Sequence, residues 1–266
     1  MNRIETRFNN LAQQGKTAFV AYITAGDPDL DTTAEIILEM DRCGVDVIEC
    51  GVPFSDPVAD GIVIQEAAQR ALAKGASLRK ILAMLKGLRD KTDVPILLFS
   101  YYNPILAYGI EQFAVDAKAA GVDGVLTVDL PPEEADFYKK CLDEQHLATV
   151  FLIAPTSPPE RIKLIARIST GFVYYVSRTG VTGVRQDVEA SVHGALDEIR
   201  KHTNKPIAVG FGISTPEQAT EVAGYADGVV VGSAIVRRIS ELGNAPDTVQ
   251  KVGAFVKSLV DATKGK

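Results

Sequence analysis

Three acidic residues stand close together in the stretch V-D-V-I-E-C-G-V-P-F-S-D-P-V-A-D-G at 45–61. Glu49 ends an apolar run that is typical of a buried strand, and Asp56 and Asp60 follow it in the next eleven residues. Burial without a partner raises the pKa of a carboxyl group, so that it can transfer protons near neutral pH. Glu49 is therefore a candidate acid/base, and the alternative is a structural carboxylate paired with a nearby Lys or Arg.

The other two acids have simpler explanations at this level. Asp56 lies in P-F-S-D-P, a pattern typical of a capped turn, which favours a structural or interfacial role. Asp60 precedes Gly61 and a helical pattern, where the commoner use of an aspartate is as an N-cap.

Two glycine-bearing turns offer a place for an anion. G-F-G-I-S (210–214) and V-G-S-A-I-V (231–236) each continue from an apolar run. Gly212 and Gly232 let the backbone approach a ligand closely, and Ser233 adds a hydroxyl and an N–H at a helix start. The alternative is that these glycines only turn the chain. Their occurrence after two successive strands favours a phosphate site, and the loop S-R-T-G-V-T-G (177–183) could close it.

Aromatic residues follow several of the apolar runs. Tyr174 and Tyr175 must point to opposite faces of a strand, so one of them should enter the core. Tyr102 could form another wall of a site, although packing is the usual role of such rings. The three histidines fall in or after helical stretches and receive no chemical role, and no metal-ligand spacing or dinucleotide fingerprint is present.

These residues must be positioned by eight short apolar runs that alternate with amphipathic helical stretches. Continuous rather than alternating apolar character is typical of a parallel sheet covered on both faces. Eight such units in 266 residues predict a single-domain α/β TIM (βα)8 barrel over 1–266, with an extra helix near 62–75 in the second βα loop. A doubly wound open sheet is the alternative. The predicted strands are 17–24, 45–50, 95–100, 124–129, 148–153, 172–177, 206–210 and 227–232.

The amino-acid composition and charge argue against some classes of function. The apolar fraction is 46% and the net charge is −6, with Lys and Arg scattered, which argues against a nucleic-acid partner. We expect no membrane association, since no apolar run approaches spanning length and the first residues are polar. The three widely spaced cysteines are expected to be reduced thiols of a cytoplasmic protein.

The stretch V-I-E-C-G-V-P-F-S-D-P-V-A-D-G resembles the signature of the tryptophan synthase alpha chain family. Further similar segments follow in order over about residues 19–236, nearly the whole chain. They are A-Y-I-T-A-G-D-P, Y-Y-N-P-I-L, V-D-L-P-P-E-E, S-R-T-G-V-T-G, G-F-G-I-S and V-V-G-S-A-I-V.

The resemblance implies a lyase that splits indole-3-glycerol phosphate into indole and glyceraldehyde 3-phosphate by a retro-aldol cleavage, without metal or cofactor. By position, Glu49 would be the acid/base, Asp60 would accept the indole N–H, and Tyr174 would position Asp60. The implied phosphate cradle is Gly183, Gly212, Gly232 and Ser233, and the implied indole pocket is Tyr22, Tyr102 and Phe211.

The resemblance also implies a partner, the tryptophan synthase beta chain, in an alpha2-beta2 heterotetramer. Indole would pass to a pyridoxal-phosphate site in that partner, and the matching contact residues are Pro53, Asp56, Pro131 and Pro132. One departure is Ile62, where family members often have proline, which puts in question only the start of the extra helix.

Two rival functions follow from the same features. Another phosphosugar barrel, such as an isomerase, would share the phosphate loops but lack the E-C-G-V-P-F-S-D-P segment. A non-catalytic barrel that binds indole or its phosphate as a regulator would not need Glu49, Asp60 and Tyr174 together.

Overall fold

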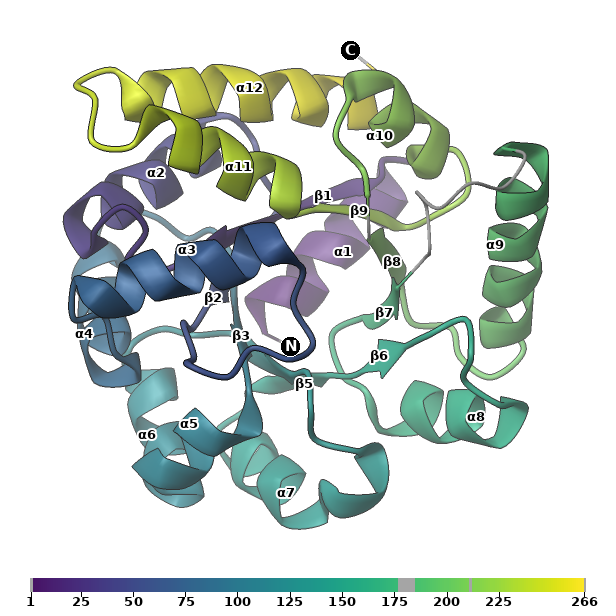
Figure 1. Cartoon of the computed structure of the whole chain (residues 1–266). Helices are drawn as coiled ribbons and strands as arrows, with labels where there is room; N and C mark the ends of the chain where they lie inside the picture. The colour runs from purple at the N-terminus through teal and green to yellow at the C-terminus, as the bar shows by residue number, and fades with distance from the viewer. Residues whose placement is uncertain (1, 177–184, 211, 266) are drawn as a thin grey trace.

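The computed structural model describes residues 2–176, 185–210 and 212–265. Its centre is a sheet of parallel strands that curls into a barrel, with helices around the outside (Figure 1). The predicted TIM barrel is confirmed. The strands are β1 Ala18–Thr24, β2 Val47–Gly51, β3 Ile96–Ser100, β4 Gly124–Thr127, β5 Ala148–Val150, β6 Leu152–Ile153, β7 Val173–Val176, β8 Ile207–Gly210 and β9 Gly228–Val231.

The two end strands of the sheet are joined by the covalent chain rather than by hydrogen bonds. The hydrogen-bonded strand order is β5-β4-β3-β2-β1-β9-β8-β7-β6, so β5 and β6 are the two ends of the sheet. Only Phe151 separates them along the chain. The predicted strand at 148–153 is therefore divided, because its first half pairs with β4 and its second half with β7.

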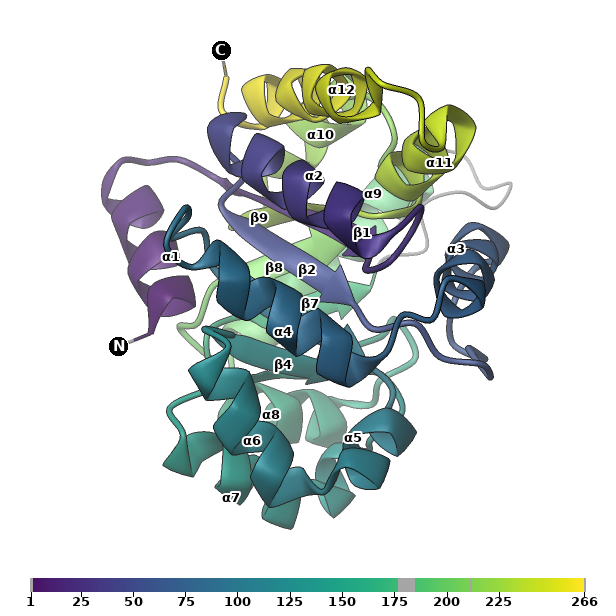
Figure 2. The same ribbon diagram turned by 90° about the vertical axis from the view of Figure 1, so that its left-hand side faces the viewer.

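Amphipathic helices cover the outer surface of the barrel (Figures 1 and 2). No helix in the described ranges combines the length and apolar character needed to cross a membrane. The helices are α1 Arg3–Gln13, α2 Leu30–Arg42, α3 Ile62–Ala73, α4 Leu78–Leu88, α5 Tyr102–Tyr108, α6 Ile110–Ala119, the 3-10 helix η1 Pro132–Glu134, α7 Asp136–Glu144, α8 Pro159–Ile168, α9 Arg185–Arg200, α10 Pro216–Ala223, α11 Ser233–Leu242 and α12 Thr248–Thr263.

Two apolar cores result from the alternation of side chains along each strand. Val47 belongs to the core inside the barrel, and Ile48 belongs to the core between the strands and the helices. Because the side-chain period of a strand is two, Glu49 shares the inward face with Val47. An acid at this position can meet a ligand only at the carboxyl end of the barrel.

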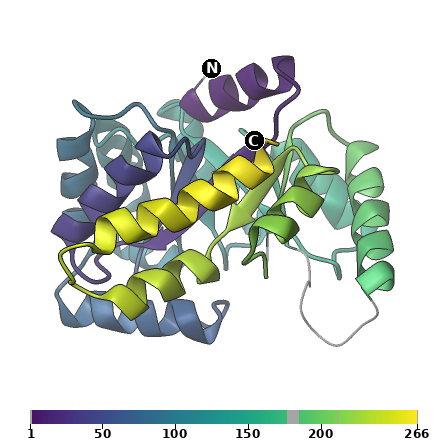
Figure 3. The same cartoon turned by 90° about the horizontal axis from the view of Figure 1, so that it is seen from above.

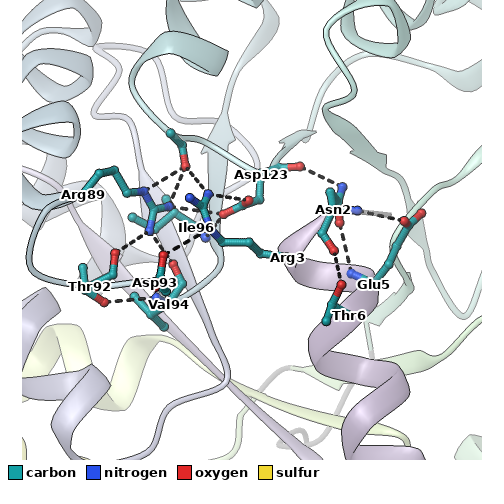
Figure 4. Close-up of polar contacts among 11 residues, drawn as sticks. Asn2, Arg3, Glu5, Thr6, Arg89, Thr92, Asp93, Val94, Ile96 and Asp123 are labelled. Carbon is teal, nitrogen blue, oxygen red and sulfur yellow. Dashed lines mark hydrogen bonds and ion pairs between the residues drawn. The ribbon is translucent and has the colours of Figure 1, made fainter.

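Helix α1 closes the opposite end. The ring of Phe8 packs on Phe172 with centroids 5.3 Å apart, inside the amino-terminal end of the barrel. Asp123, just before β4, accepts hydrogen bonds from Arg3 at 3.0 Å and from Arg89 at 3.2 Å (Figure 4). Charged and apolar contacts thus seal the amino-terminal ends of the strands, and a ligand must come from the other side.

The extra helix in the second βα loop is α3, which begins at Ile62. It is held by its own Arg70, whose guanidinium donates to both carboxylate oxygens of Asp27 at 2.9 and 2.8 Å. Asp27 follows β1 and is 3% exposed. This contact fixes α3 against the loop after β1, so the segment that carries Asp60 has an anchored end.

Candidate active site

A cavity of about 1070 Å³ opens at the carboxyl ends of the strands. Seven of the predicted site residues line it, and they come from β1, β2 and the loop after it, β7, and the turns that follow β8 and β9. These residues are Tyr22, Glu49, Asp60, Tyr174, Gly212, Gly232 and Ser233. The barrel therefore gathers residues that are up to 211 positions apart, counting from Tyr22 to Ser233.

Glu49 lies deep in this cavity. It pairs in register with Tyr22 on β1 and with Leu97 on β3, and it is 1% exposed. Its Oε1 atom has no hydrogen-bond partner among the described residues. Burial raises the pKa of this carboxyl group to about 8, so it is mostly protonated at neutral pH. Such a group can both donate and accept a proton, as the sequence predicted.

Asp60 lies on the loop between β2 and α3 and is more exposed than Glu49. Its Oδ2 atom accepts a hydrogen bond from the hydroxyl of Tyr101 at 3.1 Å, and that hydroxyl accepts the Ala59 N–H at 2.9 Å. Burial raises the pKa of Asp60 to about 6, and the hydrogen bond from Tyr101 acts in the opposite direction. The N-cap of α3 is Gly61 without a side-chain bond, so the N-cap alternative for Asp60 is wrong.

The predicted role of Tyr174 in positioning Asp60 stays a prediction, since no direct hydrogen bond joins the two side chains among the described contacts. Among the described residues, Tyr101 makes the hydrogen bond to the Asp60 side chain. Tyr174 instead lies beside Glu49, whose charge and the burial of the ring raise the pKa of the phenol. Both tyrosines contribute to the site, but Tyr101 was not predicted.

Tyr102, predicted in the indole pocket, is not among the cavity residues. It begins α5 and packs edge-on against Tyr138, with ring centroids 6.0 Å apart. Tyr101 precedes it in extended conformation and packs on Phe54 at 5.2 Å. The two neighbouring rings therefore pack in different places, and Tyr101 is the one whose hydroxyl reaches the loop that carries Asp60.

Tyr22, predicted in the indole pocket, lines the cavity. Its ring is 5% exposed and meets Phe99 edge-on, with centroids 5.1 Å apart. The Tyr22 hydroxyl occupies the space where a side chain on Gly51 would lie, and the Tyr174 hydroxyl does the same at Gly210. The sequence contained a signal for both glycines, because each ends a strand next to a buried tyrosine, but their role was not predicted.

The predicted phosphate cradle borders the same cavity, in the turns that follow β8 and β9. Gly212 has φ of 76°, a conformation that L side chains rarely adopt, and Gly232 is the residue that precedes helix α11. Ser233 is the first residue of α11, where backbone N–H groups lack partners within the helix and favour an anion. Gly183 and Phe211, predicted for the cradle and the pocket, lie outside the described residues.

The predicted partner contacts divide into two pairs. Asp56 and Pro131 are exposed, as a contact surface requires. Pro53 and Pro132 are buried within the chain, and their role at a partner interface stays a prediction. Pro53 continues directly from the end of β2, and Pro132 begins η1 with its ring turned into the protein.

Metal binding has no support in the described part of the chain, where no group of three or more His, Cys, Asp or Glu residues is placed to hold an ion. The cavity is lined by two acids with unequal, raised pKa values and by the N-terminus of helix α11. This arrangement is typical of a TIM-barrel enzyme that performs acid/base chemistry on a phosphorylated substrate.

Comparison with known proteins gives the particular family. The tryptophan synthase alpha chain family model matches residues 8–264. The tryptophan synthase alpha chain of Geotalea daltonii is 54% identical over 259 residues, covering 97% of this chain and 98% of the relative. That of Geotalea uraniireducens is 51% identical over 264 residues, covering 99% and 98%. The chain belongs to the tryptophan synthase alpha chain family.

Solved structures agree with this result. Tryptophan synthase subunit alpha from Legionella pneumophila superposes with a TM-score of 0.92 at 38% identity, covering 99% of this chain and 98% of that one. Tryptophan synthase from Mycobacterium tuberculosis gives 0.89 at 32% identity, covering 99% of each chain. The protein is a carbon–carbon lyase of tryptophan biosynthesis, and its alpha reaction cleaves indole-3-glycerol phosphate. A purely regulatory barrel is not favoured.

Proposed function

We propose that Glu49 and Asp60 divide the chemistry of this cleavage between them. The supporting observation is that both acids face one cavity but differ in environment. Burial keeps Glu49 mostly protonated at pH 7, because it raises the pKa of this group to about 8. Asp60, with a pKa of about 6 and a hydrogen bond from Tyr101, is mostly ionised at the same pH. The site thus offers a proton donor and a carboxylate together.

The cleavage proceeds in two coupled proton movements. Glu49 gives its proton to the indole carbon that carries the glycerol side chain, and the resulting positive charge on the ring nitrogen is stabilised by Asp60, which accepts the indole N–H. The hydroxyl on the adjacent side-chain carbon then returns a proton to Glu49 while the C–C bond breaks. The bond electrons enter the ring, indole and glyceraldehyde 3-phosphate form, and Glu49 is protonated again. This scheme needs neither a metal nor a cofactor.

Binding holds the substrate by its two ends. The phosphate lies against Gly212, Gly232 and the N-terminus of α11 at Ser233, with Gly183 as a further predicted contact. The indole ring lies against the wall formed by Tyr22 and Phe99, within reach of Asp60, with Phe211 as a further predicted wall. Support for this orientation is that the acids, the two tyrosine-lined walls and the N-terminus of α11 all border one cavity.

We further propose that the chain functions in the cytoplasm with a tryptophan synthase beta chain, as an alpha2-beta2 assembly that receives the indole at a pyridoxal phosphate of the partner. The β2–α3 loop supports a contact surface here, since it exposes Asp56 together with Val58, which is 86% exposed, and Ile62, which is 72% exposed. Pro131 adds a second exposed position.

The decisive experiment is an indole-release assay on purified protein with indole-3-glycerol phosphate, alone and with a beta chain. We expect slow release by the isolated chain and faster release in the complex. The Glu49→Gln variant should bind the substrate but release no indole, because an amide cannot donate this proton. Near-normal turnover by that variant would remove Glu49 from the acid/base role.

A further inference from the structure

The cavity extends beyond the cradle formed by Gly232 and Ser233. One turn further along α11 it is lined by Arg237 and Arg238, and from α12 it is lined by Lys251 and Phe255. Figure 3 shows α11 and α12 lying side by side, and α11 begins at the barrel mouth. The cavity therefore continues from the catalytic acids, past the cradle, into a groove between two helices, which we call the outer groove.

Three cations and one acid of the two helices line the outer groove. Arg238 is paired with Glu241 at 3.5 Å. Lys251 is paired with Asp247 at 2.8 Å. Arg237 is exposed and has no recorded hydrogen bond or ion pair with any described residue. Its charge is therefore the least compensated one in the groove, in a protein whose net charge is −6.

Arg237 stands four residues after Ser233, which places both on one face of α11, about one helical turn or 5.4 Å apart along the axis. Glu49 and Asp60 line a different part of the same cavity, formed by β2 and the loop after it. The outer groove therefore carries three basic side chains against one acid, whereas the two carboxyl groups belong to the part of the cavity inside the barrel mouth. A ligand with a phosphate at one end and a neutral ring at the other is oriented by this field.

We propose that the outer groove is a capture site for the substrate phosphate, in which Arg237 draws the phosphate in before it moves one turn along α11 to the cradle. This inference rests on the proposed orientation of the substrate in the cavity. In this proposal Arg237 speeds the association of the substrate and does not hold the phosphate in the final bound complex. Charge in a cleft raises association rates and makes them fall with ionic strength.

Stopped-flow fluorescence tests this directly. The chain contains no tryptophan, so the emission of a non-cleavable indole alkyl phosphate can be followed without protein background at the same wavelength. For Arg237→Gln we expect the association rate constant at low salt to fall about three- to tenfold and to lose most of its salt dependence. The dissociation rate constant should stay unchanged, and Arg237→Lys should retain most of the native rate.

Two controls separate capture from other causes. Lys163→Gln removes the same charge from an exposed position of α8, which contributes nothing to the cavity lining, and should leave both rate constants unchanged. Indole itself has no phosphate, so its association should be equally fast in the native protein and in Arg237→Gln.

The outcomes are distinct. A faster dissociation with unchanged association in Arg237→Gln would overturn the capture site, since Arg237 would then hold the bound phosphate. Unchanged rates for both steps would also overturn it. Failure of the native protein to bind the indole alkyl phosphate would contradict the proposed function itself.

Discussion

At the scale of single residues, two carboxyl groups in one cavity differ because their surroundings differ. Glu49 is enclosed by strands on both sides and has no hydrogen bond on Oε1, while Asp60 is partly solvated and accepts from Tyr101. Desolvation therefore raises the pKa of Glu49 further than that of Asp60. The surroundings of each carboxyl group, and not the residue type, therefore determine which of the two donates the proton.

The first prediction concerns the pH dependence of kcat/KM. Activity needs Asp60 ionised and Glu49 protonated, so it should rise through about pH 6 and fall through about pH 8, following the two pKa values. The Asp60→Asn variant should lose the acidic limb together with most of its activity. A profile that is flat from pH 5 to pH 9 would contradict these roles.

The second prediction concerns stability. The folded-state pKa of Glu49, about 8, lies above its ordinary value of 4.5, so its contribution to stability is complete below pH 4.5 and is lost as the pH rises through about 8. Gln does not titrate. Glu49→Gln should therefore be more stable than the native protein at pH 8, by on the order of 2 kcal/mol or more, and close to it at pH 4.5.

Urea unfolding at the two pH values measures this difference. Glu66→Gln, on the exposed side of α3, is the matched control, because it makes the same chemical change at an exposed position. Equal stability of Glu49→Gln and the native protein at pH 8 would show that the native cavity accommodates the charge.

At the scale of elements, the inserted helix α3 determines where Asp60 lies. Tyr101, at the end of β3, fixes the loop before α3, and Arg70 fixes the helix itself to Asp27 after β1. The catalytic loop is thus attached to two different strands of the barrel. Changes in α3 should affect catalysis although α3 itself carries no catalytic acid.

The third prediction tests this anchor. Arg70→Ala leaves the buried Asp27 without its cation and should lower the free energy of unfolding by about 2 kcal/mol, with a fall in kcat as Asp60 is held less firmly. Arg42→Ala removes an exposed pair with Glu39 and should cost well under about 1 kcal/mol. Equal effects of the two changes on unfolding and turnover would contradict a special role for Arg70.

At the scale of the whole molecule, the two ends of the barrel have different functions. The amino-terminal end is sealed by α1 and by the Asp123 contacts, whereas the carboxyl end is open and bordered by exposed apolar residues of the β2–α3 loop. Exposed apolar side chains beside the mouth of a cavity favour a protein partner at that end.

The fourth prediction places the beta chain there. Val58→Asp adds a charge to a side chain that is 86% exposed, and it should weaken the complex with a beta chain at least about tenfold by desolvation of that charge. Val115→Asp on α6, where the valine is 47% exposed, is the control. Titration calorimetry measures both, and equal affinities for the two variants would exclude the loop from the interface.

Much of this architecture was predictable from local pattern. The continuous apolar runs gave the strands, and the alternation of side chains placed Glu49 inside the barrel beyond Val47. The glycines at 212 and 232 indicated the cradle. The connecting segments were less predictable: Tyr101, which received no role, bonds Asp60, while Tyr102 packs on Tyr138 and does not line the cavity.

The sequence by itself determined the barrel, the family and the position of the acid/base, because strand periodicity and strand ends are local properties of the chain. Only the tertiary structure decided which tyrosine holds Asp60, how far burial raises each pKa, and that Arg237 of α11 and Lys251 of α12 line one groove. These facts depend on contacts between segments distant in the chain, and the physical reason is that packing, not local pattern, sets the direction of a loop and the solvation of a charge.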